Sequence, residues 1–354
     1  MPPKKNRRRR FDECAKPVTG NNRAAYSARE AALRILAGGM WNDDGREAAL
    51  RGLEERDRAL ASAIAAGAVR MRGAIDYYLA QFLHRDLSLL PPAVLNLLRA
   101  AVFQLRWLDR VPDWAVVNES VELARRVGGG RYQGLVNAVL RRFIREGGDL
   151  PLPSLETEPV RGLAVRHSFP EWLVERWLQR FGLDETVELL EACNKTAPLV
   201  LRTCPAGREI LAESLRGSGV AFQSGLYVPG ALVLESGANP ARLPGYGEGL
   251  FYVQDEAAML VGFLAAPGND GLVLDLCAAP GGKATHLAEL AGTGAAVMAA
   301  EPAPVRLAVL RRNIKRLRID NVFGVAADSL HPPFRPADLV LCDVPCSGTG
   351  VLRR

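Results

Sequence analysis

Two segments of the sequence combine residue types that could do chemistry. In the first, Asp275-Leu-Cys-Ala-Ala-Pro-Gly-Gly-Lys283 closes an apolar run and opens a helical pattern. Gly281 and Gly282 let the backbone approach a ligand closely, and the N–H groups at a helix N-terminus favour a carboxylate. In the second, Asp343-Val-Pro-Cys-Ser-Gly-Thr-Gly350 follows another apolar run and presents the Cys346 thiol near a carboxylate. We therefore predict a ligand-binding loop and a chemically active cysteine in one domain.

The elements that must position these segments are apolar runs that alternate with amphipathic helices after Gly271. The runs predict strands buried on both faces, with helices between them, which indicates a doubly wound parallel sheet. The expected strands are 272–276, 295–300, 322–326 and 339–342, and the expected helices are 284–291 and 305–317. Such a sheet binds ligands at the carboxyl ends of its strands, where both chemical segments fall.

The loop after the first strand limits the kind of cofactor. Lys283 is followed by Ala284, so the hydroxyl with which a P-loop binds Mg²⁺ is missing, and the G-x-G-x-x-G spacing of dinucleotide sites is also absent. We therefore expect an adenosyl cofactor without a pyrophosphate. Glu301 ends the second strand, where it can accept hydrogen bonds from ribose hydroxyls, and Asp328 ends the third on the adenine side. A surface carboxylate and a helix N-cap are the alternative roles of these two acids.

Taken together, the two segments resemble those of the RsmB/Sun family of RNA 5-methylcytosine methyltransferases. The resemblance rests on Cys277-Ala-Ala-Pro-Gly-Gly-Lys283 and Asp343-x-Pro-Cys-Ser-Gly-Thr-Gly350, both present in this order. It implies that S-adenosylmethionine is the cofactor and that carbon 5 of a cytosine in RNA, above all 16S ribosomal RNA, accepts the methyl group. The chain departs from the family's preferences at Glu301, where the family has Asp, and at Val344, where it has Ala.

The resemblance also implies roles for single residues. Cys346 would assist breakdown of a covalent adduct, Asp343 would hold the amino and ring nitrogens of cytosine, and Lys283 would lie near both ligands. The residues implied in cofactor binding are Cys277, Ala278, Ala279, Pro280, Gly281, Gly282, Lys283, Glu301, Asp328 and Asp343.

The nucleophile of the family is a different cysteine, in a Thr-Cys-Ser turn after a fifth strand. Its thiolate adds to carbon 6 of cytosine and so raises the electron density at carbon 5. The 354 residues end before such a segment. We therefore expect this chain to be incomplete at its C-terminus, to bind cofactor weakly and to be unable to methylate.

Before residue 150 the pattern is helical, because apolar residues recur three and four positions apart from 22 to 146. This periodicity predicts a compact helical bundle, and the segments 98–105, 117–123 and 136–142 resemble the NusB-type RNA-binding domain. We expect a multidomain chain with five parts. They are a basic disordered tail (1–20), the NusB-like domain (21–147), a linker (148–160), a small α/β subdomain (161–250) that resembles an RNA-binding module, and a Rossmann-like methyltransferase domain (251–354) that stops after its fourth strand.

Charge and composition limit the partners. Residues 1–150 hold 26 Lys and Arg against 17 Asp and Glu, and the remainder holds 19 against 22. This excess favours a nucleic-acid partner, although a solvated tail explains part of it equally well. No apolar run approaches the length of a membrane span, and none follows the basic N-terminus as in a secretory signal. We expect a cytoplasmic monomer that binds RNA and no membrane.

The six cysteines and four histidines show no spacing typical of a metal site. No metal is expected. Asn118, Glu119 and Asn137 lie on predicted helices of the NusB-like domain, where contacts with RNA and hydrogen bonds between helices are equally plausible.

Two alternatives stay open. The chain could be a NusB-like RNA-binding or transcription-regulating module that carries the sheet domain as a passenger, although the intact cofactor loop argues against this. A methyltransferase that acts on transfer RNA or on protein would share the catalytic motifs. Only the fused helical domain favours ribosomal RNA.

Overall fold

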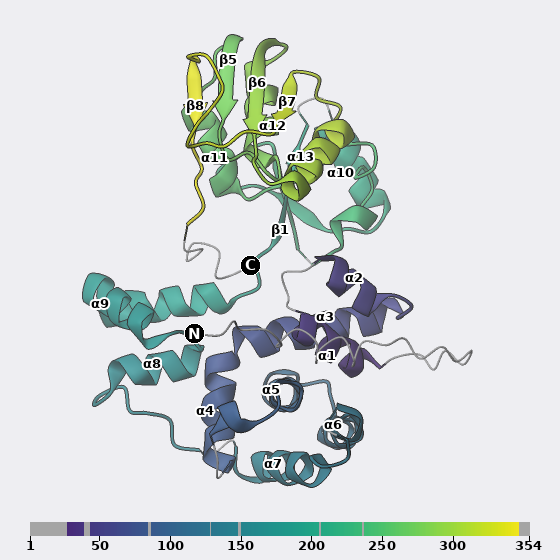
Figure 1. The fold of residues 1–354 in the computed structure, drawn as a ribbon, viewed down its shortest axis with the longest axis vertical. Helices are drawn as coiled ribbons and strands as arrows, with labels where there is room; N and C mark the ends of the chain where they lie inside the picture. The colour runs from purple at the N-terminus through teal and green to yellow at the C-terminus, as the bar shows by residue number, and fades with distance from the viewer. Residues whose placement is uncertain are drawn as a thin grey trace, which may run out of the picture. The chain divides into compact units, whose positions relative to one another are not determined.

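The computed structural model describes residues 27–38, 43–83, 86–127, 129–147, 150–204, 207–235 and 237–346. The chain divides into two compact units, Met1–Asn194 and Lys195–Arg354, each with its own hydrophobic clusters (Figure 1). The expected basic tail and the last residues of the cysteine segment, 347–350, lie outside the described residues.

Helices alone form the described part of the first unit. Pro92 begins the helix α5, where its fixed φ suits a first turn. Leu98 and Val102 of this helix share one buried cluster with Leu79, Val116 and Leu140 from three neighbouring helices, which confirms the predicted bundle. The helices of the bundle are α1 (Ala28–Gly38), α2 (Asp43–Leu50), α3 (Glu55–Arg70), α4 (Arg72–Phe82), the 3₁₀ turn Leu87–Leu89, α5 (Pro92–Trp107), α6 (Asp113–Val127) and α7 (Gln133–Glu146).

Two further helices, α8 (Pro159–His167) and α9 (Glu171–Asn194), complete the first unit. α8 packs on α4 and on α9, and the Ser168 hydroxyl after α8 accepts a hydrogen bond of 2.8 Å from the Gly73 N–H. Gly182 interrupts α9 with a φ of +76°. These contacts join residues 159–194 to the helical bundle, whereas the sequence suggested grouping residues 161–194 with the strands that follow.

The second unit begins with a four-stranded antiparallel sheet in the order β2-β3-β1-β4. Leu211 and Leu215 of the helix α10 pack on Leu201, Leu232 and Phe251 of this sheet. A small α/β layer results, as predicted. Its elements are β1 (Leu199–Thr203), α10 (Arg208–Gly217), β2 (Phe222–Ser224), β3 (Ala231–Leu234), the 3₁₀ turn Pro240–Arg242 and β4 (Phe251–Val253).

The second sheet of this unit is parallel and has the order β7-β6-β5-β8 (Figure 1). Val273 of β5 pairs with Val297 of β6 on one side and with Leu339 of β8 on the other. Val273 and Val297 belong to the buried cluster that also holds Leu287 and Leu310 from the covering helices, and Leu339 packs against it. The predicted doubly wound sheet is confirmed. Its elements are α11 (Glu256–Ala265), β5 (Asp270–Asp275), α12 (Gly282–Ala291), β6 (Gly294–Ala300), α13 (Pro304–Leu317), β7 (Val322–Val325) and β8 (Leu339–Leu341).

The strand order fixes where a ligand can enter. From β5 the chain runs outward to β6 and β7, and then returns to place β8 on the opposite side of β5. The order reverses between β5 and β8, and a crevice outside the carboxyl ends of the strands is expected at such a switch point.

Candidate active site at the carboxyl edge of the parallel sheet

The predicted site residues follow strands that share one edge. Asp275 ends β5, Glu301 follows β6, and Asp343 follows β8. The groups that shift the pKa of the Cys277 thiol indicate which side chains lie close together at this edge. Burial raises the pKa of its thiol, and so do the nearby Cys342, Asp275 and Glu301, while a hydrogen bond with Ser329 acts in the opposite direction. Groups at the end of β5 and after β6, β7 and β8 therefore lie around one side chain.

The loop from 277 to 283 turns on Gly281, whose φ of +114° belongs to the left-handed region. A Cβ added to Gly281 would lie 2.8 Å from Leu310 Cδ1, so a side chain there would be both strained and crowded. At Gly282 an added Cβ would lie 3.0 Å from the ring of Tyr252. Gly281 is therefore required by this backbone path, and a side chain at Gly282 would need the Tyr252 ring to move by a few tenths of an ångström. The path ends in the first turn of α12.

The carbonyl groups of the loop are held from α13. Arg306 Nη2 donates to Ala279 O at 2.9 Å, and Asn313 Nδ2 donates to Pro280 O at 2.9 Å. On the strand side, the Ala278 N–H donates to Ala300 O at 2.9 Å. These bonds satisfy the outward carbonyls of the loop and leave the first N–H groups of α12 as donors toward a ligand.

The two chemical segments meet through an ion pair. Lys283 Nζ, in the first turn of α12, lies 2.5 Å from Asp343 Oδ2, in the segment after β8. The side chains are 24% and 55% exposed, so solvent and ligands can reach both. The structure thus brings Lys283 and Asp343 together across the switch point of the sheet.

Asp275 is a member of this site that the sequence reasoning did not assign. The residue is 1% exposed, and burial raises the pKa of its carboxyl group to about 6, although the Cys277 N–H and Lys283 act to lower it. Asp343 contributes a further rise. The signal in the sequence was its position, as an acid at the last residue of the strand that leads into the glycine loop.

Glu301 is buried and already engaged by its own chain. One carboxylate oxygen accepts a 3.0 Å hydrogen bond from the Ala303 N–H, and the other lies 3.2 Å from Arg306 Nη1. Arg306 therefore links the acid after β6 to the loop carbonyl of Ala279, a role that the sequence reasoning missed. Its signal was its position in the first turn of the helix that follows Glu301.

Asp328 and Cys346 lie at the exposed rim of the edge. Asp328 Oδ1 accepts a 3.0 Å hydrogen bond from the Leu330 N–H in a turn between β7 and β8. In the described segment after β7 no helix begins at this turn, so the alternative role of Asp328 as a helix N-cap is wrong. Cys346 is exposed three residues beyond Asp343, and the residues 347–350 that complete its turn are not among those described.

Three family models match the chain. The NusB family matches residues 26–145, the ferredoxin-like domain of RsmF/B-like methyltransferases matches 169–240, and the 16S rRNA methyltransferase RsmB/F family matches 262–354. A relative in Synechocystis, named probable ribosomal RNA small subunit methyltransferase B, is 33% identical over 93% of this chain and 76% of its own length. The ribosomal RNA small subunit methyltransferase B of Sodalis glossinidius is 34% identical over 85% and 69%. The chain belongs to the RsmB family.

Solved structures agree with the fold of this RsmB-family chain. PH0851 superimposes with a TM-score of 0.77 at 23% identity, over 93% of this chain and 76% of that one. A methyltransferase homolog from Pyrococcus horikoshii matches with a TM-score of 0.50 at 26% identity, over 55% of this chain and 66% of that one.

Two further features of the RsmB-family chain concern metal ligands and membrane helices. Among the described residues, His, Cys, Asp and Glu nowhere gather in a group of three or more that could hold a metal ion. Within the same residues, no helix combines the length and the apolar character needed to cross a membrane.

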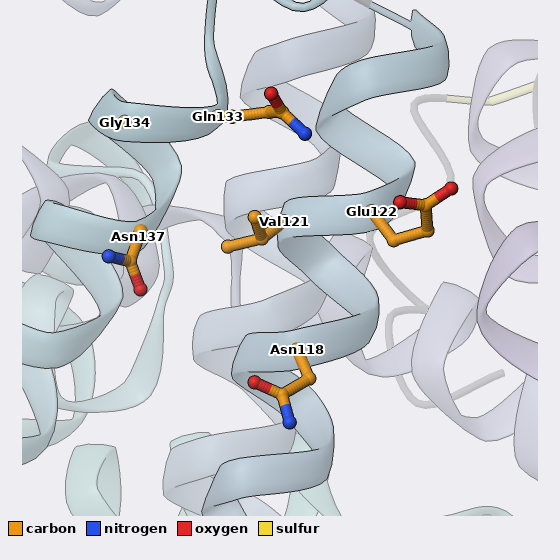
Figure 2. Close-up of a pocket in the computed structure, with 6 residues that line it drawn as sticks. All are labelled: Asn118, Val121, Glu122, Gln133, Gly134 and Asn137. Atoms are coloured by element: carbon orange, nitrogen blue, oxygen red, sulfur yellow. The ribbon is translucent and has the colours of Figure 1, made fainter.

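The helical unit carries a groove of about 530 Å³ between α6 and α7. Figure 2 shows the amides of Asn118, Gln133 and Asn137 around it, together with Glu122 and Gly134. Asn137 Oδ1 accepts a 2.9 Å hydrogen bond from Arg141 Nε within α7. Of the three polar residues weighed for RNA contact, Asn118 and Asn137 line this groove, whereas Glu119 pairs with Arg29 of α1 at 2.5 Å and so holds helices together.

Proposed function

We propose that the second unit binds S-adenosylmethionine and serves the transfer of its methyl group to carbon 5 of a cytosine in small-subunit ribosomal RNA. The observation that carries this proposal is the ion pair between Lys283 and Asp343, because it joins a glycine loop suited to the cofactor to the segment that bears Cys346. Membership of the RsmB family supports the same reaction.

The residues at the edge fit an adenosyl cofactor with an amino-acid tail. The N-terminal residue before α12, Gly281, has no side chain to cap the helix, so the backbone N–H groups of Gly282 and Lys283 can donate to a carboxylate. Glu301 keeps acceptor capacity for ribose hydroxyls beyond the bonds that orient it, and Asp328 is the acid proposed for the adenine side. Cys277, Ala278, Ala279 and Pro280 would form the wall between them.

The proposed roles at cytosine divide between the same segments. The cofactor supplies an electrophilic methyl group on a sulfonium. Asp343, oriented by Lys283, would accept the hydrogen bond of the cytosine amino group and hold the base. Cys346 would take the proton from carbon 5 after methylation, which restores the double bond to carbon 6 and expels the nucleophilic sulfur from that carbon.

The partner and the compartment are part of the proposal. RNA is the proposed substrate of the catalytic unit, and the NusB-like unit is the proposed second contact with it. Ribosomal RNA as substrate would place the reaction in the cytoplasm. That the chain acts as a monomer stays a prediction, as do the domain boundaries given by the sequence, apart from residues 161–194, which lie in the helical unit.

The experiment uses the natural gene product that contains these 354 residues, cofactor labelled in its methyl group, and naked 16S RNA. Digestion of the product to nucleosides should give label in 5-methylcytidine, and Asp343→Asn should abolish it. Label in any other nucleoside would contradict the proposed reaction. Equal or faster labelling of transfer RNA or of protein would favour the alternative substrates.

A further inference from the structure

A buried arginine links the small antiparallel sheet to the first turns of α12. Arg202, on β1, donates to Gly282 O at 2.6 Å and to Thr285 Oγ1 at 2.9 Å, and its Nε lies 3.0 Å from Glu289 Oε2. Positions 282, 285 and 289 are spaced three and four apart, so they form one face of the helix. A single guanidinium thus binds two turns of α12, the helix that follows the cofactor loop.

The side chains around Arg202 bury it and fix its position. The Arg202 and Glu289 side chains are 4% and 10% exposed, and Gln254 Oε1 accepts a further hydrogen bond of 2.5 Å from Arg202. The guanidinium carbon lies 5.4 Å from the centre of the Tyr252 ring. Burying an ion pair costs desolvation that a pair of apolar side chains avoids, so this pair contributes little stability that packing could not replace. The guanidinium is planar and its N–H donors have a fixed geometry, so it does fix the orientation of the groups that it binds.

These contacts act on the peptide groups that the cofactor needs. Gly282 O belongs to the peptide group that carries the Lys283 N–H, and Thr285 Oγ1 in turn donates to Gly281 O at 2.6 Å. Tyr252, which stacks on Arg202, also packs against Gly282. A change at Arg202 would therefore act directly on the first turn of α12, from which the N–H groups and the Lys283 side chain project.

We propose that Arg202 is a positioning residue, which sets the geometry of the cofactor loop from the small antiparallel sheet through Gly282, Thr285 and Glu289. The inference rests on the proposed binding of S-adenosylmethionine. It makes the antiparallel sheet a part of the cofactor site, in addition to any contact of that sheet with RNA.

The test compares cofactor affinity with stability by using an apolar replacement of the whole ion pair. Arg202→Met with Glu289→Leu removes both charges and fills their space, but it leaves Gln254 Oε1 and Gly282 O without their donor, so the double variant should stay folded and unfold at a temperature somewhat below wild type. We expect its Kd for S-adenosylmethionine, measured by isothermal titration calorimetry, to rise about 10- to 100-fold because the loop is misplaced. Arg202→Lys keeps the charge but loses the planar guanidinium, so its Kd should lie between that of wild type and that of the double variant.

Leu211→Ala is the matched control, since Leu211 is fully buried on α10 of the same unit and contacts the sheet rather than α12. It should lower the unfolding temperature yet leave the Kd within about twofold of wild type, because folded molecules keep the loop intact. A double variant that binds as tightly as wild type would overturn the positioning role. A wild-type chain that does not bind the cofactor at all would instead overturn the proposed function.

Discussion

The buried carboxyl group of Asp275 makes the stability of the second unit depend on pH. Burial raises its pKa from 3.8 to about 6. Between these values the folded chain binds more protons than the unfolded chain, so the free energy of unfolding falls as the pH rises from about 4 to about 6. At 1.36 kcal/mol for each tenfold change in proton affinity, the fall is at most about 3 kcal/mol.

We expect Asp275→Asn to remove this fall, because the amide stays neutral at every pH. Urea unfolding of wild type and variant between about pH 4 and about pH 7 measures it. Asp270→Asn, at the exposed start of the same strand, should keep the wild-type slope. If Asp275→Asn kept that slope as well, the carboxyl group would not be the cause.

Lys283 is expected to matter for chemistry far more than for stability. Its ion pair with Asp343 is partly exposed, and such pairs contribute about 0–1 kcal/mol. Lys283→Met should therefore change the free energy of unfolding by less than about 1 kcal/mol. Methyl transfer by the natural gene product should fall by at least about 100-fold, because the charged group that orients Asp343, the residue proposed to hold the cytosine, is lost. A variant with near wild-type transfer would refute this role.

At the scale of elements, the role of the left-handed turn before α12 can be tested by comparing the glycines at the two ends of this helix. Gly281→Ala would add strain at a φ of +114° and a contact with Leu310, whereas Gly292→Ala at the other end of the helix would add strain alone, at +69°. We expect a loss of about 1–3 kcal/mol for Gly292→Ala and a larger one for Gly281→Ala. Only Gly281→Ala should weaken cofactor binding by calorimetry, and equal affinities would contradict the assignment of the loop.

The crossing of α3 and α5 depends on Gly67. A Cβ there would lie 1.9 Å from Phe103 Cζ, so the ring would have to move. Gly67→Ala should lower the free energy of unfolding by about 1–3 kcal/mol through overpacking, as measured by chemical denaturation. Gly134→Ala on α7 has open space and should instead stabilise by up to about 1 kcal/mol. A stabilising Gly67→Ala would show that the helices can separate at no cost.

Elements of this chain were easier to predict than their long-range partners. Apolar runs near 272–276 and 295–300 predicted β5 and β6 because burial on both faces leaves a continuous apolar signature. The contact of Arg202 with Glu289 spans 87 residues, and neither local sequence indicates it. Glu301 and Arg306 are only five residues apart, but their ion pair was not predicted, because a carboxylate at the end of the second strand is equally suited to bind the ribose.

At the scale of the molecule, ligand binding should stabilise one unit and leave the other unchanged. S-adenosylmethionine at about 100 times its Kd should raise the free energy of unfolding of the second unit by about 2.7 kcal/mol. Hydrogen exchange should slow at the amides of β5 and α12, and stay the same at those of α5. Slower exchange in α5 would mean that the two units unfold together.

The helices α8 and α9 show that the start of the ferredoxin-like match does not coincide with the division of the chain into two compact units. The ferredoxin-like match begins at residue 169, between these helices, yet Leu163 of α8 and Leu190 of α9 share one buried cluster and α8 covers α4. Cutting the chain at 168 would leave each half with an uncovered apolar seam, which invites aggregation. Fragments meant for crystallisation or binding studies should therefore be divided after Asn194.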